Sequence, residues 1–376
     1  MTRGFARAEY EARVAAAQAR MDATGLAAIL LTTEADLRYF SGFLTRFWES
    51  PSRPWFLVLP VSGAPRAVIP SIGAALMAKT WIDDIRTWPA PAPQDDGISL
   101  LAEALRETGG PVGLPMGRES HLRMPLDDFA LLKEASGLHF TDDRGIVRDL
   151  RAIKSEAEIA KIAETCAIAG RAFDRVPEIA RPGAPLSRVF RDFQRLLLEE
   201  GADWVPYLAG GAGPGGYGDV ISPATDAPLA SGDVLMLDTG AVRDGYFCDY
   251  DRNFALGAVG AEARDAHLRL IEATAAGEAA ARPGARACDV YDSMAKITGG
   301  GEGAGRLGHG LGMQLTEGLS LMAGDDTVLR EGMVITLEPG VALGPGRIMV
   351  HEENIVIRKG APERLTRFAG SEMVEL

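Results

Sequence analysis

Four carboxylates and one imidazole in the last third of the chain could close around metal ions. They stand in short stretches that end or interrupt apolar runs, and they are Asp238, Asp249, His309, Glu338 and Glu352. Carboxylate oxygens with a single imidazole suit Mn²⁺ or Mg²⁺, with Zn²⁺ and Co²⁺ as alternatives. Carboxylates gathered in one cavity would repel each other unless cations neutralised them. The sequence therefore predicts one site with two divalent ions, of which Mn²⁺ is favoured.

The first two of these carboxylates are separated by a turn sequence. Asp238 ends the apolar run at 234–237, and Asp249 follows the strand-like sequence GYFC at 245–248. This spacing predicts a β-hairpin whose two carboxylates face each other across the strands. Two exposed turn acids would have the same spacing, but the apolar neighbours of both aspartates favour a buried pair that shares a cation.

The other three candidates are each ambiguous when taken alone. His309 stands between glycines in GHGLG, where the backbone can approach a ligand closely, although a structural histidine is an alternative. Glu338 ends an apolar strand before Pro-Gly, which is an ordinary place for a glutamate. Glu352 and Glu353 interrupt an apolar strand, and a metal ion facing one of them would explain the interruption.

The composition of the chain favours a two-domain protein of a reducing compartment. It has 376 residues, of which 47% are hydrophobic, enough for two domains with buried cores. The net charge of −13 argues against nucleic-acid or anionic-membrane partners, because both need a basic surface. We find no apolar leader segment and no run of about 18 apolar residues, so we expect no membrane span. Three cysteines without a CxxC pair then predict a cytoplasmic location.

The elements that must position the candidate ligands fall into two parts. Residues 1–151 alternate between expected strands and helices, with strands at 26–31, 55–60, 66–70 and 112–115 and helices at 8–23, 98–110 and 127–137. This alternation predicts an α/β domain with a parallel or mixed sheet. A capping box of Ser155 and Glu158 then opens a long helix, so we place a second domain at 152–376.

A short internal repeat occurs in the second domain. The sequence Arg-Pro-Gly-Ala stands at 181–184 and again at 282–285, each time between an alanine-rich helix and an amphipathic one. A four-residue match can arise by chance. The alternative is a domain of two similar halves packed face to face, with a site in the cleft between them.

Taken in order, the stretches LDTG…GYFCD, GHGLG, LEPG and HEEN resemble the pita-bread metallohydrolases. This family includes aminopeptidase P, prolidase, methionine aminopeptidase and the metal-free creatinase, and the resemblance covers nearly the whole chain. It implies an α/β (α+β) fold, with a creatinase-type N-terminal domain followed by a pseudo-two-fold pita-bread catalytic domain. It also implies a homodimer.

The resemblance maps the five metal ligands of the family onto the candidates named above. Asp249 and Glu352 would bridge or chelate both ions, and the register of EENIVI favours Glu352 over Glu353. In this family two ions, commonly Mn²⁺, Co²⁺ or Zn²⁺, activate a water that attacks an amide carbonyl. Glu338 would act as the general base.

The sequence departs from the peptidases of the family around these ligands. Two histidines that hold the substrate carbonyl in the family are replaced, by Ile221 and by Thr316. An arginine two residues before the last ligand is replaced by Val350, and the threonine of the usual Asp-x-Thr-Arg is replaced by Asp251. The side chains that could compensate for these losses are His351, Asp251, Thr316 and Glu317.

Two aromatic residues, Trp204 and Tyr207, precede a glycine-rich segment at 210–218. The segment predicts a mobile loop over a pocket that these aromatic side chains could line, with ordinary core packing as the alternative. Our candidate substrate-binding residues are Trp204, Tyr207, Thr316 and Asp251, and our candidate catalytic residues are Glu338 and His351.

The resulting hypothesis is a dinuclear-metal hydrolase of amide bonds that resembles an Xaa-Pro aminopeptidase or dipeptidase. Its substrate would be a small molecule or a short peptide. Because both family histidines are replaced, a hydrolase or lyase of a small non-peptide nitrogenous metabolite, such as a compatible solute, stays open. A metal-free creatinase-like enzyme and a non-catalytic binding protein are further alternatives, and the intact ligand set argues against both.

Overall fold

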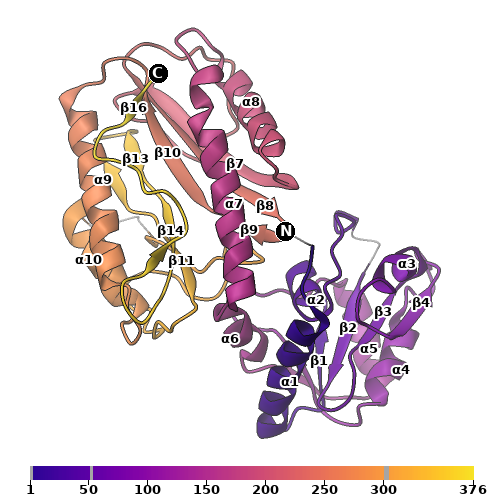
Figure 1. Ribbon diagram of the computed structural model, residues 1–376. Coiled ribbons are helices and arrows are strands. Elements are labelled where there is room, and N and C mark those ends of the chain that lie inside the picture. The colour runs from indigo at the N-terminus through magenta and orange to yellow at the C-terminus, as the bar shows by residue number, and fades with distance from the viewer. Residues whose placement is uncertain (1–2, 51–53, 300–304) are drawn as a thin grey trace. The chain divides into compact units, whose positions relative to one another are not determined.

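The computed structural model describes residues 3–50, 54–299 and 305–376. The chain divides into two compact units, Met1–Arg151 and Ala152–Leu376, whose helices and strands are drawn in Figure 1. Both units mix helices with sheets, which confirms the predicted α/β (α+β) class. Within the described ranges, no helix has the length and apolar character needed to cross a membrane.

The N-terminal unit is a mixed sheet with helices around it. Among the described residues, six strands pair in the order β4-β3-β2-β1-β5-β6. Strand β1 runs antiparallel to β2 and parallel to β5, so the sheet is mixed, as the sequence predicts. The strands are β1 Ala28–Leu31, β2 Phe56–Pro60, β3 Arg66–Pro70, β4 Asp84–Trp88, β5 Val112–Leu114 and β6 Phe140–Asp142.

Helix α4 of this unit buries one apolar face against the sheet. Leu101 and Leu105 of α4 pack with Leu30 of β1 and Val58 of β2 in one core cluster. Burial of such side chains stabilises the fold by roughly 1.5–3 kcal/mol each. The helices are α1 Arg7–Thr24, α2 Glu34–Ser41, α3 Ala74–Met77, α4 Ile98–Arg106, α5 Leu126–Ser136 and α6 Ile146–Ala152, with a 3₁₀ turn, η1, at Ser71–Gly73.

The second unit contains all the candidate ligands and is built from paired helices and sheets. Helix α7 packs against α8, and α9 packs against α10 (Figure 1). The largest sheet has the order β16-β10-β8-β7, with β9 paired to β8, while β14 lies between β11 and β15 and β12 pairs with β13. The helices are α7 Glu156–Asp174, η2 Val176–Glu178, α8 Leu186–Glu199, α9 Ala261–Ala280 and α10 Ala287–Thr298. The strands are β7 Trp204–Pro214, β8 Asp233–Arg243, β9 Tyr246–Phe247, β10 Tyr250–Ala255, β11 Val334–Leu337, β12 Gly340–Ala342, β13 Ile348–Val350, β14 Glu353–Val356, β15 Glu363–Arg364 and β16 Val374–Glu375.

Helix α7 begins at the predicted capping box. The Ser155 hydroxyl accepts a hydrogen bond from the Glu158 backbone N–H at 3.3 Å, and the Glu158 carboxylate accepts one from the Ser155 N–H at 3.0 Å. These two bonds satisfy backbone donors that a helix start leaves without partners. One apolar face of the helix is buried and contains Ile159, Ile162, Cys166, Ala169 and Phe173.

The two Arg-Pro-Gly-Ala sequences make the same backbone hydrogen bonds. The Gly183 N–H donates to the Leu229 carbonyl at 2.7 Å, and the Gly284 N–H donates to the Leu329 carbonyl at 2.9 Å. Both glycines have a positive φ, 86° and 91°, which suits glycine because it has no Cβ. The two glycines, and the two leucines that accept their hydrogen bonds, are each about 100 residues apart. The short sequence repeat therefore corresponds to a structural repeat within the unit. Asp238 and Glu338 share this spacing.

The glycine-rich segment at 210–218 is not a loop over a pocket. Its first part belongs to strand β7, and its last aromatic residue, Tyr217, is only 1% exposed. The Tyr217 hydroxyl accepts a hydrogen bond from the Val350 N–H at 2.7 Å. The glycines allow close backbone packing instead, since a Cβ on Gly210 would lie 2.2 Å from the Met236 carbonyl oxygen. The prediction of mobility was therefore wrong.

The predicted hairpin forms, but its register differs from the expectation. Asp244 and Gly245 make the tight turn, with φ of 48° and 79°, and β10 then places Asp251 opposite Asp238. Asp249 precedes Asp251 by two residues, so it lies diagonally from Asp238 on the same face of the sheet. The two-residue turn fixes this register, because moving it by one residue would turn every side chain to the other face.

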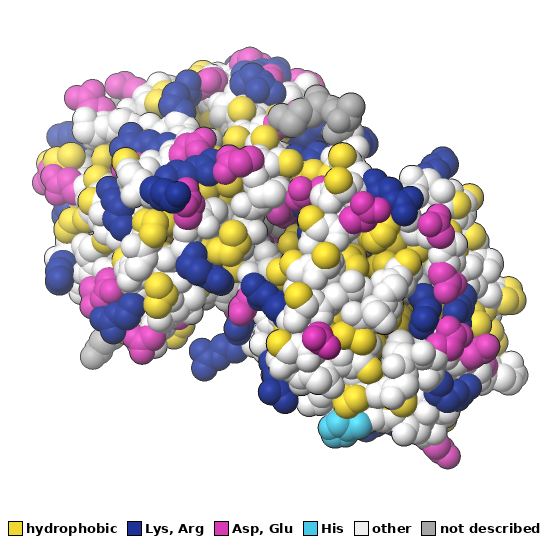
Figure 2. Space-filling view, turned by 60° about the horizontal axis from the view of Figure 1, so that its bottom comes forward, with side chains coloured by type: hydrophobic (Ala, Val, Ile, Leu, Met, Phe, Trp, Pro, Cys, Tyr) yellow, Lys and Arg dark blue, Asp and Glu magenta, His cyan; other side chains and the backbone are white. Residues whose placement is uncertain are grey.

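Charged side chains are interspersed on the surface. Figure 2 shows Lys and Arg mixed with Asp and Glu over the face that it draws. An example is Arg175, which pairs with Glu178 and Glu200 at 3.0 and 2.9 Å. Exposed pairs of this kind contribute only about 0–1 kcal/mol each, so they say more about solubility than about the fold.

Candidate metal centre

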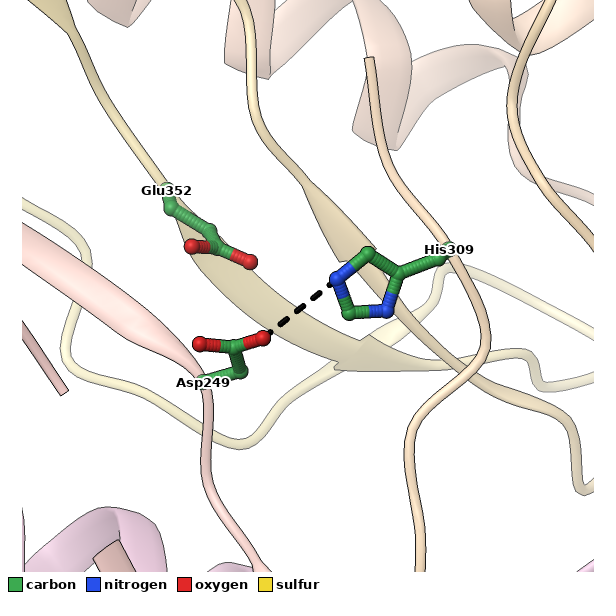
Figure 3. A group of neighbouring side chains, drawn as sticks. All are labelled: Asp249, His309 and Glu352. Carbon is green, nitrogen blue, oxygen red and sulfur yellow. Dashed lines mark ion pairs between the residues drawn. The ribbon is translucent and has the colours of Figure 1, made fainter. Parts of the chain in front are cut away.

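Three of the five candidate ligands turn their side chains toward one another (Figure 3). Asp249, His309 and Glu352 each offer one ligand atom within 4.8 Å of those of the other two, and all three residues are buried. The His309 Nε2 atom lies 3.3 Å from Asp249 Oδ2 and 3.8 Å from Glu338 Oε1. Donor separations of this size fit atoms that surround one cation at its usual bond lengths.

The remaining two candidates, Asp238 and Glu338, are half-buried residues near this group. The pKa of Asp238 is raised well above its usual range by burial first, and then by the charge of Asp249. The charge of Glu338 contributes to the same shift, so the three carboxyl groups share one neighbourhood. The structure thus gathers the two aspartates of the hairpin with Glu338 and Glu352, which lie about 100 residues further along the chain.

The electrostatics of the group are unfavourable for carboxylates alone. Burial raises the pKa of Glu352 well above its usual range, and the charges of Asp249 and Glu338 raise it further. Burial also raises the pKa of Asp249, where Arg306 acts in the opposite direction and Asp251 adds to the rise. Ionised acids in this arrangement repel each other, and bound cations would remove that cost.

Unsatisfied oxygen atoms show that the group fits metal ions. One oxygen of each of four candidate carboxylates is buried without a hydrogen-bond partner among the described residues, namely in Asp238, Asp249, Glu338 and Glu352. Buried polar atoms normally have a partner, because burying a polar group without one costs free energy. Oxygen atoms turned inward with no proton to accept are the donor set that a hard divalent cation requires.

Hydrogen bonds hold two of the ligand candidates in place. The Asn354 side chain, at the second residue of β14, accepts from the Asp249 N–H at 3.1 Å and donates to the Asp249 carbonyl. His309 Nδ1 lies 3.0 Å from the Gly310 carbonyl, so it carries the proton and leaves Nε2 as the acceptor atom facing the carboxylates. Gly310 has room only for a hydrogen, since a Cβ there would lie 2.1 Å from the Glu317 carbonyl oxygen.

A second layer of charged residues lies behind the ligand candidates. His351 Nδ1 is 3.1 Å from Asp251 Oδ1, and its Nε2 is 3.2 Å from Glu353 Oε1. Burial alone would lower the pKa of His351, but its hydrogen bonds with these two carboxylates outweigh burial and raise the pKa to about 9. Asp251 also accepts a hydrogen bond from the Glu352 N–H at 3.1 Å.

This second layer changes the roles that the sequence suggested. Both ring nitrogens of His351 face carboxylates, so the geometry favours a positioning residue over a catalytic one. Asp251 is 1% exposed and accepts a hydrogen bond from the Glu352 backbone, a position that favours a supporting role, and its part in substrate binding stays a prediction. Glu353 is paired with Arg252 at 3.1 Å, so the neighbouring Glu352 is the glutamate that faces the cluster.

Replacing His351 with alanine is expected to lower the free energy of unfolding by about 3–5 kcal/mol, because it leaves the buried Asp251 carboxylate without its cationic partner. The raised pKa of about 9 means that the stabilisation is complete below the unperturbed value of 6.5 and is lost as the pH rises through 9. Urea unfolding should show that fall in the wild type and not in the variant. His139→Ala, at an exposed position of the N-terminal unit, is the matched control. Equal pH profiles for wild type and His351→Ala would contradict this assignment.

The candidate substrate-binding residues are not all at the cluster. Tyr207 is, since its pKa is raised by burial first, and then by the charge of the neighbouring Asp238 carboxylate. Thr316 accepts a hydrogen bond from Arg306 Nη2 at 3.1 Å. Trp204 pairs with Val242, four residues beyond Asp238 on β8, or about 13 Å along the strand.

Two residues at the cluster, Asn354 and Arg306, were not predicted from the sequence. Asn354 clamps the Asp249 backbone, and its position after the two glutamates of HEEN gave no signal of that contact. Arg306 Nε lies 3.5 Å from Glu338 Oε1, and only its position three residues before His309 could have suggested this. Ile221, which replaces a family histidine, is 82% exposed on a surface loop.

Known families match both units of the chain. Residues 160–359 match the profile of metallopeptidase family M24, and residues 13–153 match the creatinase/prolidase N-terminal domain. The probable dipeptidase PepE of Mycobacterium tuberculosis is 30% identical over 372 residues, which cover 95% of this chain and 94% of that protein. The Xaa-Pro dipeptidase of Pyrococcus horikoshii is 31% identical over 282 residues, or 72% of this chain and 76% of that one.

Solved structures have the same fold. Dipeptidase PepE from Mycobacterium ulcerans superimposes with a TM-score of 0.84 at 28% identity and covers 99% of both chains. A prolidase from Thermococcus sibiricus gives a TM-score of 0.87 at 23% identity over 99% of this chain and 100% of its own, which is a likeness of fold. These matches confirm the predicted pita-bread architecture with a creatinase-type N-terminal domain.

Proposed function

The chain belongs to metallopeptidase family M24, and from this premise we propose that it hydrolyses Xaa-Pro dipeptides at a site with two divalent metal ions. Membership of the family makes it a metal-dependent hydrolase. The observation that supports the proposal best is the set of four carboxylates that each bury one oxygen without a hydrogen-bond partner among the described residues. We propose Mn²⁺ as the native ion, with Zn²⁺ or Co²⁺ as alternatives.

The chain supplies three kinds of group to this reaction. Asp238, Asp249, His309, Glu338 and Glu352 would hold the ions. When bound, such ions make an attacking water more acidic and polarise the scissile carbonyl. Glu338 is the carboxylate best placed to accept the proton of that water, because its Oε1 accepts no hydrogen bond among the described residues and its side chain is 25% exposed. Tyr207, beside Asp238, is placed to contact bound substrate.

Hydrolysis of Ala-Pro by the purified protein tests this proposal. We expect Mn²⁺-dependent release of proline that is lost on chelation and restored by adding the ion back, because the apo site lacks its electrophile. Chromatography of the released amino acids measures the reaction. A protein that binds the ions but leaves every proline dipeptide intact would contradict the peptidase proposal.

One specific observation favours a second candidate function. The positions of the two family histidines hold Thr316, which is bonded to Arg306, and Ile221, which points to the surface. A substrate that needs no imidazole at its carbonyl, such as a cyclic or N-acyl amide of a small nitrogenous metabolite, would suit this site. A panel of such amides, assayed with the same Mn²⁺-loaded protein, separates this candidate from the first.

Assembly and compartment stay predictions. The family resemblance suggests a homodimer, which sedimentation equilibrium of the purified protein would test. The three cysteines are buried and form no disulfide in the described structure, in keeping with the expected cytoplasmic location.

A further inference from the structure

Arg306 is a cationic side chain at the rim of the carboxylate cluster. Its Nε lies 3.5 Å from Glu338 Oε1, and its Nη2 donates to the Thr316 hydroxyl at 3.1 Å. Its charge also acts on Asp249, where it opposes the rise of the carboxyl pKa. The guanidinium is therefore held in a defined place by a carboxylate on one side and a hydroxyl on the other.

The exposed fractions show that solvent reaches the cluster on the Arg306 side. The side chain of Arg306 is 36% exposed and that of Glu338 is 25% exposed. Those of Asp249 and His309 are 5% and 3% exposed. A molecule that enters from solvent on this side meets the guanidinium before it reaches the buried ligand candidates.

Charge balance makes Arg306 an anion-binding group once metal is present. Two divalent cations would neutralise the four carboxylates that we propose as ligands. In the layer behind them, carboxylates are already balanced by cationic side chains, in the pairs Asp251–His351 and Glu353–Arg252. Among the described residues, the carboxylate that pairs with Arg306 is Glu338, which the ions would then share, so part of the guanidinium charge is left for a ligand.

The guanidinium also has the geometry for a carboxylate. Arginine carries five N–H donors in a planar fork that matches the two oxygens of a carboxylate. Glu338 and Thr316 engage the Nε and one Nη2 position, and the exposed part of the fork is available to a ligand. A lysine at this position would offer the charge without the fork.

We propose that Arg306 determines specificity by binding a free carboxylate close to the scissile amide of the substrate, with Thr316 as the positioning residue that orients the guanidinium. This inference rests on the proposed function and narrows it. It selects dipeptides and acylated amino acids over longer or amidated peptides, in which the corresponding group is an uncharged amide. The same requirement applies to the small-metabolite alternative, whose substrate would then be an amino-acid derivative.

The first test compares Ala-Pro with its carboxamide on the Mn²⁺-loaded enzyme. We expect wild type to prefer the free acid by about 10- to 100-fold in kcat/KM, the usual range for hydrogen bonds to a charged group. Arg306→Gln should lose that preference mainly through a higher KM for the acid, with metal content and circular dichroism unchanged. Arg306→Lys should keep part of it, and Thr316→Val should raise KM by a smaller factor. The matched control is Arg171→Gln, which removes an exposed arginine of α7 that pairs with Glu200.

The second test measures binding without turnover. Calorimetry should show that L-proline binds the metal-loaded wild type about 10- to 100-fold more tightly than L-prolinamide, and that Arg306→Gln abolishes the difference. Equal rates on acid and amide in wild type, or a preference that Arg306→Gln retains, would overturn the inference while the peptidase function stands. If no proline peptide is cleaved, the proposed function fails, and calorimetry alone tests the role of Arg306. Tighter binding of L-proline than of L-prolinamide that depends on Arg306 supports the inference. Equal binding of the two compounds overturns it.

Discussion

Replacing Asp249 with asparagine is expected to remove bound metal from the site and to lower kcat/KM on Ala-Pro by a factor of about 10³ or more. Asp249 faces both His309 and Glu352 within 4.8 Å, so it is the carboxylate that the other candidates surround. Losing a metal ion that stabilises charge costs several kcal/mol of transition-state stabilisation, and each 1.4 kcal/mol is about tenfold in rate. Metal analysis by mass spectrometry and steady-state kinetics measure the two effects.

In the metal-free protein, by contrast, the same substitution is expected to raise the free energy of unfolding. Asparagine keeps the shape of Asp249 but removes one of the charges that repel Glu352 and Asp238. Metal-free Asp249→Asn should therefore be more stable than the metal-free wild type near neutral pH. The matched control is Asp143→Asn, a buried aspartate of the N-terminal unit that caps helix α6 through the Val147 N–H. Full metal content in Asp249→Asn would contradict the assignment.

Removing the metal is expected to lower the melting temperature of the wild type by about 10 °C. A ligand present at about 1,000 times its dissociation constant stabilises the folded state by about 4 kcal/mol. For a unit of the size of Ala152–Leu376, each kcal/mol corresponds to about 2–4 °C. Differential scanning calorimetry of the Mn²⁺-loaded and chelator-treated protein measures this difference.

The loss of stability on metal removal should grow as the pH rises. The folded-state pKa values of Asp238, Asp249 and Glu352 are raised above their usual range, mainly by burial. A carboxyl with a raised pKa favours folding below the unfolded pKa, near 4, and this contribution is lost as the pH climbs through the folded value. The metal-free protein should therefore be less stable at about pH 8 than at about pH 5, and metal binding should offset the change. A metal-free protein that gains stability over this range would contradict the account of the site.

The parts of the fold that the sequence predicted correctly depend on local chemistry. Helix α1 ends at Gly25, whose φ of 72° is a left-handed cap that glycine adopts easily. Helix α7 starts at the Ser155 capping box for a similar reason. The Arg-Pro-Gly-Ala repeat is also present in the structure, because the glycine of each copy donates a hydrogen bond to the carbonyl of an equivalent leucine.

The parts that the sequence did not predict depend on contacts between distant segments. Only the tight turn at Asp244 and Gly245 decides that Asp251, and not Asp249, pairs with Asp238. The roles of His351 and Asn354 likewise depend on partners about 100 residues away, which no local pattern reveals. The glycines at 210–218 look mobile in the sequence, yet neighbouring strands hold them close. The ligand set itself stays a prediction that rests on the order of the motifs and on the gathered side chains.

Anomalous diffraction from crystals grown with Mn²⁺ tests the central claim most directly. We predict two peaks in the second unit, among the side chains of Asp238, Asp249, His309, Glu338 and Glu352, which would hold the ions. Crystals grown with Mn²⁺ that show no peak among Asp249, His309 and Glu352 would contradict the proposed metal site, whether or not Mn²⁺ is bound elsewhere.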